Sequence, residues 1–188
     1  MNFREALERG PMVCDGAMGT MLHAAGNSLD QALPALNLTN AALVRTIHDS
    51  YVGAGVNIIQ TNTFGASRLR LSEYGFGERV DEINRAGVRL ARQAAQAGRS
   101  VLVAGSVSPA VSVQQRRRVR GEERAGALRE QVQALTDAGV DLVLLETFGY
   151  LDELVEAVEI ATAASDVPVI AQATFATDTQ TLSGHTPR

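Results

Sequence analysis

The 188-residue sequence contains no tryptophan, and aromatic residues make up 4% of the chain. A hydrophobic fraction of 45% with 20% charged residues is nevertheless ordinary for a globular domain. The core must therefore be aliphatic, built from valine, leucine, isoleucine and alanine. A compact chain of this length buries about 70% of its unfolded surface, which is enough to sustain one domain.

Cysteine, basic charge and long apolar runs are also scarce. Cys14 is the single cysteine, so no internal disulfide can form, and a reducing, cytoplasmic location is expected. No apolar run approaches the roughly 20 residues that span a bilayer, and the N-terminus lacks the apolar core of a signal peptide. The net charge of −4 predicts neither nucleic acid nor a membrane as a partner. The one basic cluster, at 115–121, has no interleaved aromatic residues for base stacking, which favours a solvated loop.

Short apolar runs alternate with helical patterns along the chain. The runs are rich in branched residues and almost continuously hydrophobic, which is typical of strands buried on both faces of a parallel sheet. They lie at 11–16, 56–62, 101–107, 141–147 and 167–175. Helices are predicted at 41–54, 78–97, 122–138 and 151–164, the first of them capped by Thr39 or Asn40. The wording Ala-Gly-Val-Asn/Asp at 54–57 and 138–141 marks the same turn from helix to strand.

This β-α-β-α order fits two parallel-sheet architectures, the doubly wound open sheet and the (β/α)8 TIM barrel. DGAMGT after the first run has two glycines three apart, so it is not the Gly-x-Gly-x-x-Gly dinucleotide fingerprint. A complete barrel needs about 250 residues. Thr186 before Pro187 has the wording of a helix start close to the end of the sequence. We therefore predict an α/β domain over 1–188, a TIM barrel truncated after about its fifth strand, with the C-terminal part absent.

In either architecture, ligands bind where strands end and loops begin. Two acids stand out at such positions, because Asp15 and Glu146 each follow an apolar run. A buried carboxylate needs a positive or hydrogen-bonding partner, and no Lys or Arg stands at these strand ends. The partner is then a cation of the ligand, such as an ammonium group. Alternatively, Asp15 caps a turn beside Gly16 and Glu146 caps the following helix. The residues alone leave both interpretations open.

A set of motifs covers the chain in order: DGAMGT, LNLTN, YVGAGVNIIQTNTFGASRLRLSEYG, INRAG, AGSVSP, GVDLVLLETF and AQATF…TLSGHTP. This set resembles the homocysteine S-methyltransferase family, which includes the homocysteine-binding barrel of cobalamin-dependent methionine synthase. The stretch from QTNTFGA to RLRLSEYG is especially similar to bacterial bifunctional homocysteine methyltransferase/methylenetetrahydrofolate reductases. The resemblance implies a (β/α)8 barrel that binds homocysteine at its C-terminal mouth and takes part in methionine formation.

The resemblance also implies roles for single residues. Asp15 and Glu146 match the acids that hold the amino group of homocysteine, and Gly16 leaves room for close backbone approach. Phe64 matches an aromatic residue that lines the amino-acid pocket. Thr63 is a further expected pocket residue, and two more candidates share its position at strand ends: Asn62 and Ser106.

Zinc is the cofactor that the resemblance implies, because the family uses it to deprotonate the homocysteine thiol before methyl transfer. Family members hold the ion with three cysteines, one after the sixth strand and an adjacent pair after the eighth, so the ligands are expected beyond residue 188. No residue of this chain is therefore predicted as a metal ligand or as catalytic, and the isolated chain is expected to be inactive. His23, His48 and His185 show no ligand spacing. We predict His48 as an exposed surface residue and Cys14 as a small buried strand residue.

The methyl donor is not predicted, although cobalamin or folate can serve as methyl carrier in the full protein. The exposed edges of an incomplete barrel are expected to favour association with another chain. Two alternatives remain open at this stage. The chain can be a non-catalytic module that binds an amino acid or a partner, or another TIM-barrel enzyme that uses Asp15 and Glu146 for proton transfer.

Overall fold

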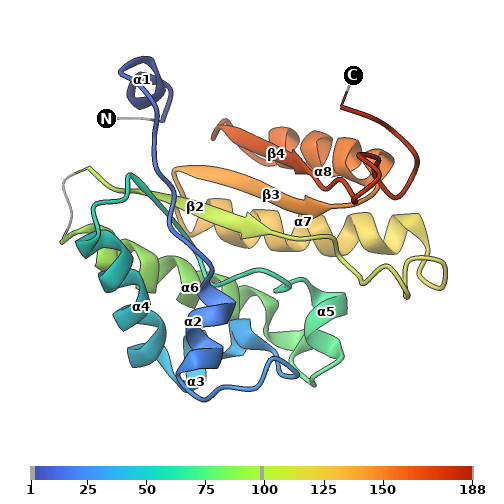
Figure 1. Cartoon of the computed structure of the whole chain (residues 1–188). Helices are drawn as coiled ribbons and strands as arrows, with labels where there is room; N and C mark the ends of the chain where they lie inside the picture. Colours follow the sequence, from blue (N-terminus) through green and yellow to red (C-terminus); the bar gives the residue numbers. More distant parts are fainter. Residues whose placement is uncertain (1–2, 98–99, 188) are drawn as a thin grey trace.

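The computed structural model describes residues 3–97 and 100–187. Within these ranges four parallel strands form one sheet in the order β1-β2-β3-β4, and the major helices cover one face of it (Figure 1). The strands are β1 (Ile58–Gln60), β2 (Leu102–Val107), β3 (Leu142–Phe148) and β4 (Val169–Ala173), and the covering helices are α4 (Ala41–Gly53), α6 (Val80–Ala95), α7 (Gly121–Asp137) and α8 (Leu151–Ala164). The predicted α/β class is confirmed, and the sheet is consistent with part of a (β/α)8 barrel. The extent of truncation stays a prediction.

Shorter elements complete the described chain. They are α1 (Phe3–Glu8), α2 (Met18–Ala24), η1 (Leu33–Ala35), α3 (Leu36–Thr39), α5 (Arg68–Ser72) and η2 (Gly77–Arg79). Most of them lie in the connections that surround the carboxyl ends of the strands, and α1 lies at the opposite end (Figure 1).

β2 and the first half of β3 are buried on both faces, as their continuous hydrophobicity predicts, whereas β4 is partly exposed. Side chains such as Ile59, Val103 and Val143 pack against the helices in the largest core cluster. Their neighbours along the strands, including Ile58 and Leu142, form a second cluster on the opposite face. Since successive strand residues point to opposite faces, the two clusters require apolar residues at nearly every strand position.

Local signals place the helix ends close to their predicted positions. The Asn40 side chain caps α4 by accepting a hydrogen bond from the Leu43 N–H (3.4 Å). Gly55 and Gly139 end the two matching Ala-Gly turns with φ of 93° and 87°, a conformation that favours glycine. The chain from 184 to 187 is irregular, and the helix start at Thr186 stays a prediction, because the described residues end at 187.

The prediction of a strand at 11–16 is wrong in part. This segment runs parallel to β1 but forms only an isolated bridge, between Cys14 and Ile58. Asn57 interrupts the ladder, because its side-chain oxygen takes the Val13 N–H (2.8 Å). Cys14 is exposed, contrary to the prediction of a buried residue, because the segment has β1 as a neighbour on one side and an open edge on the other.

The prediction that His48 is an exposed surface residue is also wrong. It is fully buried, because its position one residue after Ile47 and four after Val44 puts it on the inner stripe of α4, the helix that packs against α6. Neither ring nitrogen has a hydrogen-bond partner in the described chain. Burial lowers the pKa of His48 to about 4, so the imidazole is neutral at physiological pH.

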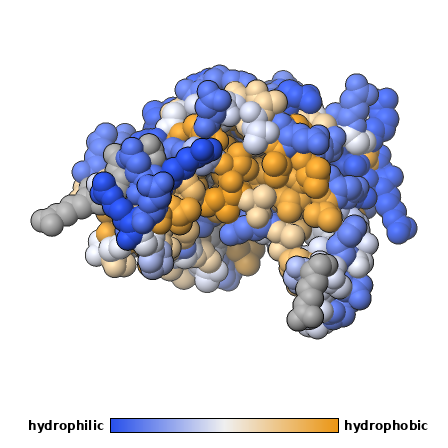
Figure 2. All heavy atoms as spheres, turned by 90° about the horizontal axis from the view of Figure 1, so that it is seen from above, coloured by the Kyte–Doolittle hydropathy of each residue, from blue (hydrophilic) through white to orange (hydrophobic). Residues whose placement is uncertain are grey.

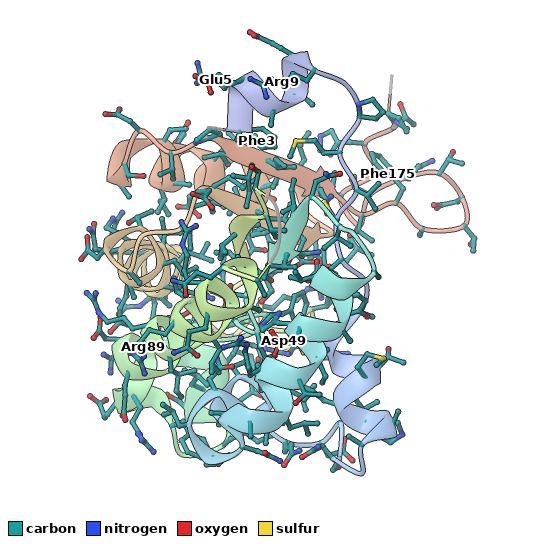
Figure 3. All side chains as sticks on the ribbon, turned by 90° about the vertical axis from the view of Figure 1, so that its left-hand side faces the viewer. Phe3, Glu5, Arg9, Asp49, Arg89 and Phe175 are labelled. Atoms are coloured by element: carbon teal, nitrogen blue, oxygen red, sulfur yellow. The ribbon has the colours of Figure 1, made fainter. Side chains whose placement is uncertain are left out.

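One face of the sheet is covered at its amino end by α1, where Phe3 lies between the helix and the strands (Figure 3). β4 is the last strand in the order of the sheet and forms one of its edges, where Ala171 and Gln172 are exposed. Viewed from the side of β4 and α8, hydrophobic side chains reach the surface (Figure 2). None of the helices described is long and apolar enough to cross a membrane.

Candidate functional site

A cavity of about 410 Å³ opens at the carboxyl ends of the strands. It brings together four of the five predicted site residues, which come from segments far apart in the sequence: Asp15, Gly16, Phe64 and Glu146. The other lining residues are Ala17, Met18, Gly19, Leu33, Gln60, Thr61, Asn62 and Ser106. The predicted location at strand ends therefore matches a concave site lined by two acids.

Asp15 is held at the cavity wall by β1. The Gln60 N–H donates to one carboxylate oxygen of Asp15 (2.9 Å), and the Gln60 side-chain amide donates to the other (3.2 Å). Burial raises the pKa of Asp15 to about 6, the Gln60 hydrogen bonds oppose that rise, and the nearby Glu146 charge adds to it. Its ionised form is therefore costly in the empty site and would be stabilised by a cation.

Glu146 projects into the same cavity from the end of β3. Its carboxylate accepts a hydrogen bond from the Ser106 hydroxyl (2.6 Å), while burial raises its pKa above the ordinary value. A β-bulge between Leu145 and Phe148 follows directly, with Thr147 at a φ of 64°. A threonine at positive φ is a strained conformation, of the kind that persists where the surrounding structure imposes it. Glu146 thus does not cap the next helix, the alternative considered from the sequence, because α8 has no side-chain cap.

Thr63, the fifth predicted residue, does not line the cavity. It is fully buried, and its hydroxyl donates to the Ser106 carbonyl (2.7 Å) and lies 2.6 Å from the Thr61 hydroxyl. Thr61 in turn accepts from the Ser106 N–H (3.1 Å). The two threonines therefore fix Ser106, the residue that holds Glu146.

Gly16 is explained by a neighbour that the sequence did not single out. A Cβ at this position would lie 2.9 Å from the Tyr51 hydroxyl oxygen, which is closer than such atoms approach. Tyr51 reaches from α4 to the loop after Asp15, where its hydroxyl lies 3.4 Å from the Ala17 carbonyl oxygen. The glycine lets helix and loop pack closely at the cavity rim.

Buried amides fix the loop between β1 and α5, and sequence reasoning missed most of them. Asn37 and Asn62 exchange hydrogen bonds of 2.9 and 3.1 Å. The Gln131 amide donates to the Thr63 carbonyl (2.9 Å), and the Asn84 amide donates to the Ala66 carbonyl (2.9 Å). The only available signal was an amide residue at an apolar position of a helix pattern, where an unpaired buried amide would be costly.

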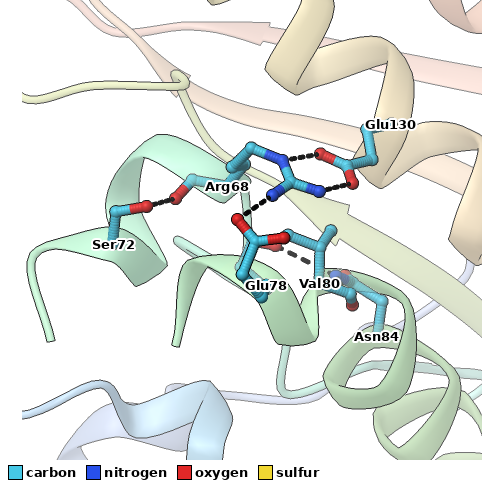
Figure 4. A network of polar contacts seen from close by, with 7 residues as sticks. Arg68, Ser72, Glu78, Val80, Asn84 and Glu130 are labelled. Carbon is cyan, nitrogen blue, oxygen red and sulfur yellow. Dashed lines mark hydrogen bonds and ion pairs between the residues drawn. The ribbon is translucent and has the colours of Figure 1, made fainter. Parts of the chain in front are cut away.

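An arginine links the same loop to the helix layer (Figure 4). Arg68, at the start of α5, donates through Nε to Glu130 of α7 (2.9 Å) and through a second nitrogen to the same carboxylate (2.5 Å). A third nitrogen contacts Glu78 in η2 (2.7 Å). Such a fork-like pair restricts both distance and angle, so it orients the segment that carries Phe64.

The described residues do not form a zinc site, and the ligands that the resemblance implies are expected beyond residue 188. Across 3–97 and 100–187, no group of three His, Cys, Asp or Glu side chains could hold a metal ion. His23 Nδ1 lies 2.9 Å from the Asn27 carbonyl oxygen, and His185 Nδ1 lies 3.0 Å from the Ser183 hydroxyl oxygen. Zinc chemistry is therefore not assigned to any side chain described here.

Comparison with known proteins decides the family. The family model for homocysteine S-methyltransferase matches residues 12–188. The chain belongs to the homocysteine S-methyltransferase family. It is 31% identical to methionine synthase of Mycobacterium tuberculosis and 30% identical to that of Mycobacterium leprae, over 96% of this chain in each case. The aligned part is 16% of the length of each methionine synthase.

Solved structures of the family have the same fold. The metallated form of the homocysteine methyltransferase MmuM from Escherichia coli superposes with a TM-score of 0.80 at 28% identity, covering 98% of this chain and 70% of that chain. The apo form of MmuM gives a TM-score of 0.74. Homocysteine is the substrate of this family.

Proposed function

We propose that the cavity binds homocysteine and that Asp15 and Glu146 hold its ammonium group. The observation that carries this proposal is that neither acid has a cationic partner in the described chain, although burial raises the pKa of both. An ammonium group supplies the missing positive charge and three N–H donors. Phe64 supplies an apolar wall for the side chain of the ligand.

The two acids are positioned by neutral hydrogen-bond donors. Gln60 binds both oxygens of Asp15 from one side, and Ser106 binds one oxygen of Glu146. Both carboxylates are therefore held in place before a ligand arrives, which reduces the entropy lost on binding. We propose further that the chain is a partial homocysteine-binding domain of a zinc-dependent methyltransferase.

In that reaction the homocysteine sulfur forms a bond to the methyl carbon. The bond between this carbon and the donor breaks, and its electron pair stays on the donor, so that methionine is released after the thiol proton is lost. The residues of this chain bind and orient the amino acid. The expectation that the chain is inactive by itself stays a prediction, and a methionine-formation assay with the purified chain tests it. The identity of the methyl donor stays unassigned. The use of a cobalamin or folate carrier and the association with a second protein chain stay predictions.

Isothermal titration with L-homocysteine tests the binding proposal. Asp15→Asn and Glu146→Gln should each weaken binding by about 10- to 150-fold, because each removes a charged hydrogen bond worth about 1.5–3 kcal/mol. Glu122→Gln is the matched control, since Glu122 is an exposed acid on α7 that does not line the cavity. N-acetyl-homocysteine has no ammonium group and should not bind. If it binds as well as homocysteine, or if both variants match the control, the two acids do not hold the amino group.

A further inference from the structure

Three buried hydroxyl residues connect the ends of β1 and β2 at the cavity: Thr61, Thr63 and Ser106. The ladder between these two strands ends with the pair of Gln60 and Ala104, whereas β2 continues through Ser106. The side chains of the two threonines extend the ladder. The Ser106 N–H donates to the Thr61 hydroxyl (3.1 Å), and the Thr63 hydroxyl donates to the Ser106 carbonyl (2.7 Å). Both backbone polar groups of Ser106 are therefore held by side chains in place of a strand.

These hydrogen bonds form a closed ring that can run in one direction only. A backbone N–H can only donate, and a carbonyl oxygen can only accept. The Thr63 proton therefore lies toward the Ser106 carbonyl, and the 2.6 Å contact between the two threonine hydroxyls uses the Thr61 proton, which Thr63 accepts. Each threonine hydroxyl donates once and accepts once. Removal of either hydroxyl would leave a buried polar group without its partner, which is costly.

The ring leaves the side-chain hydroxyl of Ser106 for Glu146. That hydroxyl donates to Glu146 Oε1 (2.6 Å). Asp15 is the other titratable residue that lines the cavity, and its charge acts on the same space. Gln60 binds both oxygens of Asp15, whereas Ser106 binds one oxygen of Glu146. The orientation of Glu146 in the cavity therefore depends on where Ser106 places its hydroxyl.

The helix layer fixes Thr63 from two sides. The Gln131 amide of α7 donates to the Thr63 carbonyl (2.9 Å). Gly87 of α6 lies so close that a Cβ at this position would be 2.8 Å from Thr63 Cγ2. Threonine carries its methyl and hydroxyl groups on the same carbon, so the contact of the methyl group with α6 also fixes the hydroxyl. The Thr63 side chain therefore connects the packed helices with the ring around Ser106, although it does not line the cavity.

We propose that Thr63 is a positioning residue for Glu146, and thereby for the ligand ammonium group, and that it acts through Ser106 without touching the ligand. Without the Thr63 hydroxyl, the buried Thr61 hydroxyl loses its acceptor and the Ser106 carbonyl loses its 2.7 Å hydrogen bond. Ser106 is then held less firmly, and its hydroxyl donates less well to the ionised form of Glu146. The effect on affinity rests on the proposed binding of homocysteine, whereas the effect on Glu146 does not.

Titration of Glu146 in the ligand-free chain tests this connection. Carbon NMR of the glutamate side-chain carboxyl groups follows each acid, and Glu146→Gln identifies the signal. Ser106→Ala should raise the pKa of Glu146, because the hydroxyl stabilises the ionised carboxylate. Thr63→Val should also raise this pKa, and it should add no further rise in the Ser106→Ala background. An unchanged pKa in Thr63→Val, or the same rise in both backgrounds, would overturn the proposal.

Isothermal titration with L-homocysteine tests the consequence for binding. Thr63→Val should weaken binding by about three- to tenfold, because a buried hydrogen bond that positions Glu146 is lost. Thr63→Ser keeps the hydroxyl and should stay within about twofold of the parent. In the Glu146→Gln background, Thr63→Val should change the affinity by less than about twofold, since its action passes through that carboxylate. A loss of equal size in both backgrounds means that Thr63 acts through packing alone and refutes the positioning role.

Thr162→Val is the matched control, because Thr162 is an exposed threonine of α8 whose hydroxyl also donates to a backbone carbonyl, that of Val158 (2.8 Å). It should change neither the pKa of Glu146 nor the affinity for homocysteine. Thermal unfolding verifies that each variant is folded, and Thr63→Ala takes the place of Thr63→Val if the latter does not fold. If the parent chain does not bind homocysteine, the proposed function is wrong, and the pKa of Glu146 still decides whether Thr63 positions this acid.

Discussion

The raised pKa of Asp15 makes homocysteine binding pH-dependent in a range where most carboxylates have finished titrating. Burial places this pKa at about 6, against an ordinary value of 3.8. The ligand ammonium requires an ionised carboxylate, so protonation of Asp15 competes with binding. Binding therefore weakens as the pH falls through the pKa of the free site.

The size of the effect follows from the fraction of Asp15 that is ionised. With a pKa of about 6, about 91% of the carboxyl is ionised at about pH 7 and about 9% at about pH 5. The dissociation constant for homocysteine should consequently rise about tenfold between these two values, a loss of about 1.4 kcal/mol. Glu146 adds to the slope, because its pKa is also raised. No histidine is among the residues that line the cavity.

The assay is isothermal titration of the chain with L-homocysteine across this pH range, repeated with Asp15→Asn. The variant should bind more weakly near pH 7 and show a much flatter profile, since it has no carboxyl to titrate at this position. The exposed-acid control Glu122→Gln should keep the parent profile. A parent dissociation constant that changes less than about twofold between about pH 5 and pH 7 refutes the reasoning, as does a slope that Asp15→Asn leaves intact.

Three further predictions concern stability. The pKa of His48 is about 4 in the folded chain against an ordinary value of 6.5, so the unfolded chain takes up the proton at a higher pH. The free energy of unfolding should therefore fall by up to about 3 kcal/mol as the pH drops from 6.5 to 4. Denaturant titrations should show a smaller pH dependence of this free energy in His48→Leu, and an unchanged pH dependence would contradict the prediction. Arg68→Met should lower the free energy of unfolding by about 1 kcal/mol, less so in high salt, because the ion pairs are partly exposed; no loss at low salt would contradict this. Gly87→Ala should destabilise the protein by about 1–3 kcal/mol, because the new Cβ would lie 2.8 Å from the Asn37 amide nitrogen. Gly126→Ala, whose new Cβ would have no atom within 4 Å, should instead stabilise α7 by about 0.5–1 kcal/mol. Equal effects of the two substitutions in thermal unfolding would exclude the packing argument.

Sequence periodicity was sufficient for the repeating part of the fold. The four long helices and the four paired strands lie within a few residues of their predicted ranges, because their apolar spacing and glycine turns are local signals. The segment at 11–16 was harder, since whether an apolar run pairs fully depends on its neighbours. The Val13 N–H donates to the Asn57 side chain, and the local sequence of neither residue predicts that hydrogen bond.

The site was predictable where chemistry stands at a strand end. Asp15 and Glu146 were marked by their position after apolar runs, and both line the cavity. Thr63 shows the limit, because a hydroxyl at the same kind of position turned inward to hold Ser106. Tyr51 and Gln131 were missed because their partners are distant in sequence, and the pairing of a buried amide becomes visible only when the helices have packed.

The bulge in β3 has a consequence for how this chain can change length. Up to Leu145 the strand alternates between its two faces, and the extra residue, Thr147, interrupts the count. Glu146 therefore faces the cavity lined by the two acids, Thr147 lines a neighbouring cavity of about 290 Å³, and Phe148 enters the core beneath the helices. Deleting Thr147 would restore strict alternation with Glu146 and Phe148 still on their present faces, and would remove only the side chain between them. Strict alternation without a deletion would instead turn Phe148 onto the face of Glu146, so the extra residue allows three side chains in a row to reach three environments.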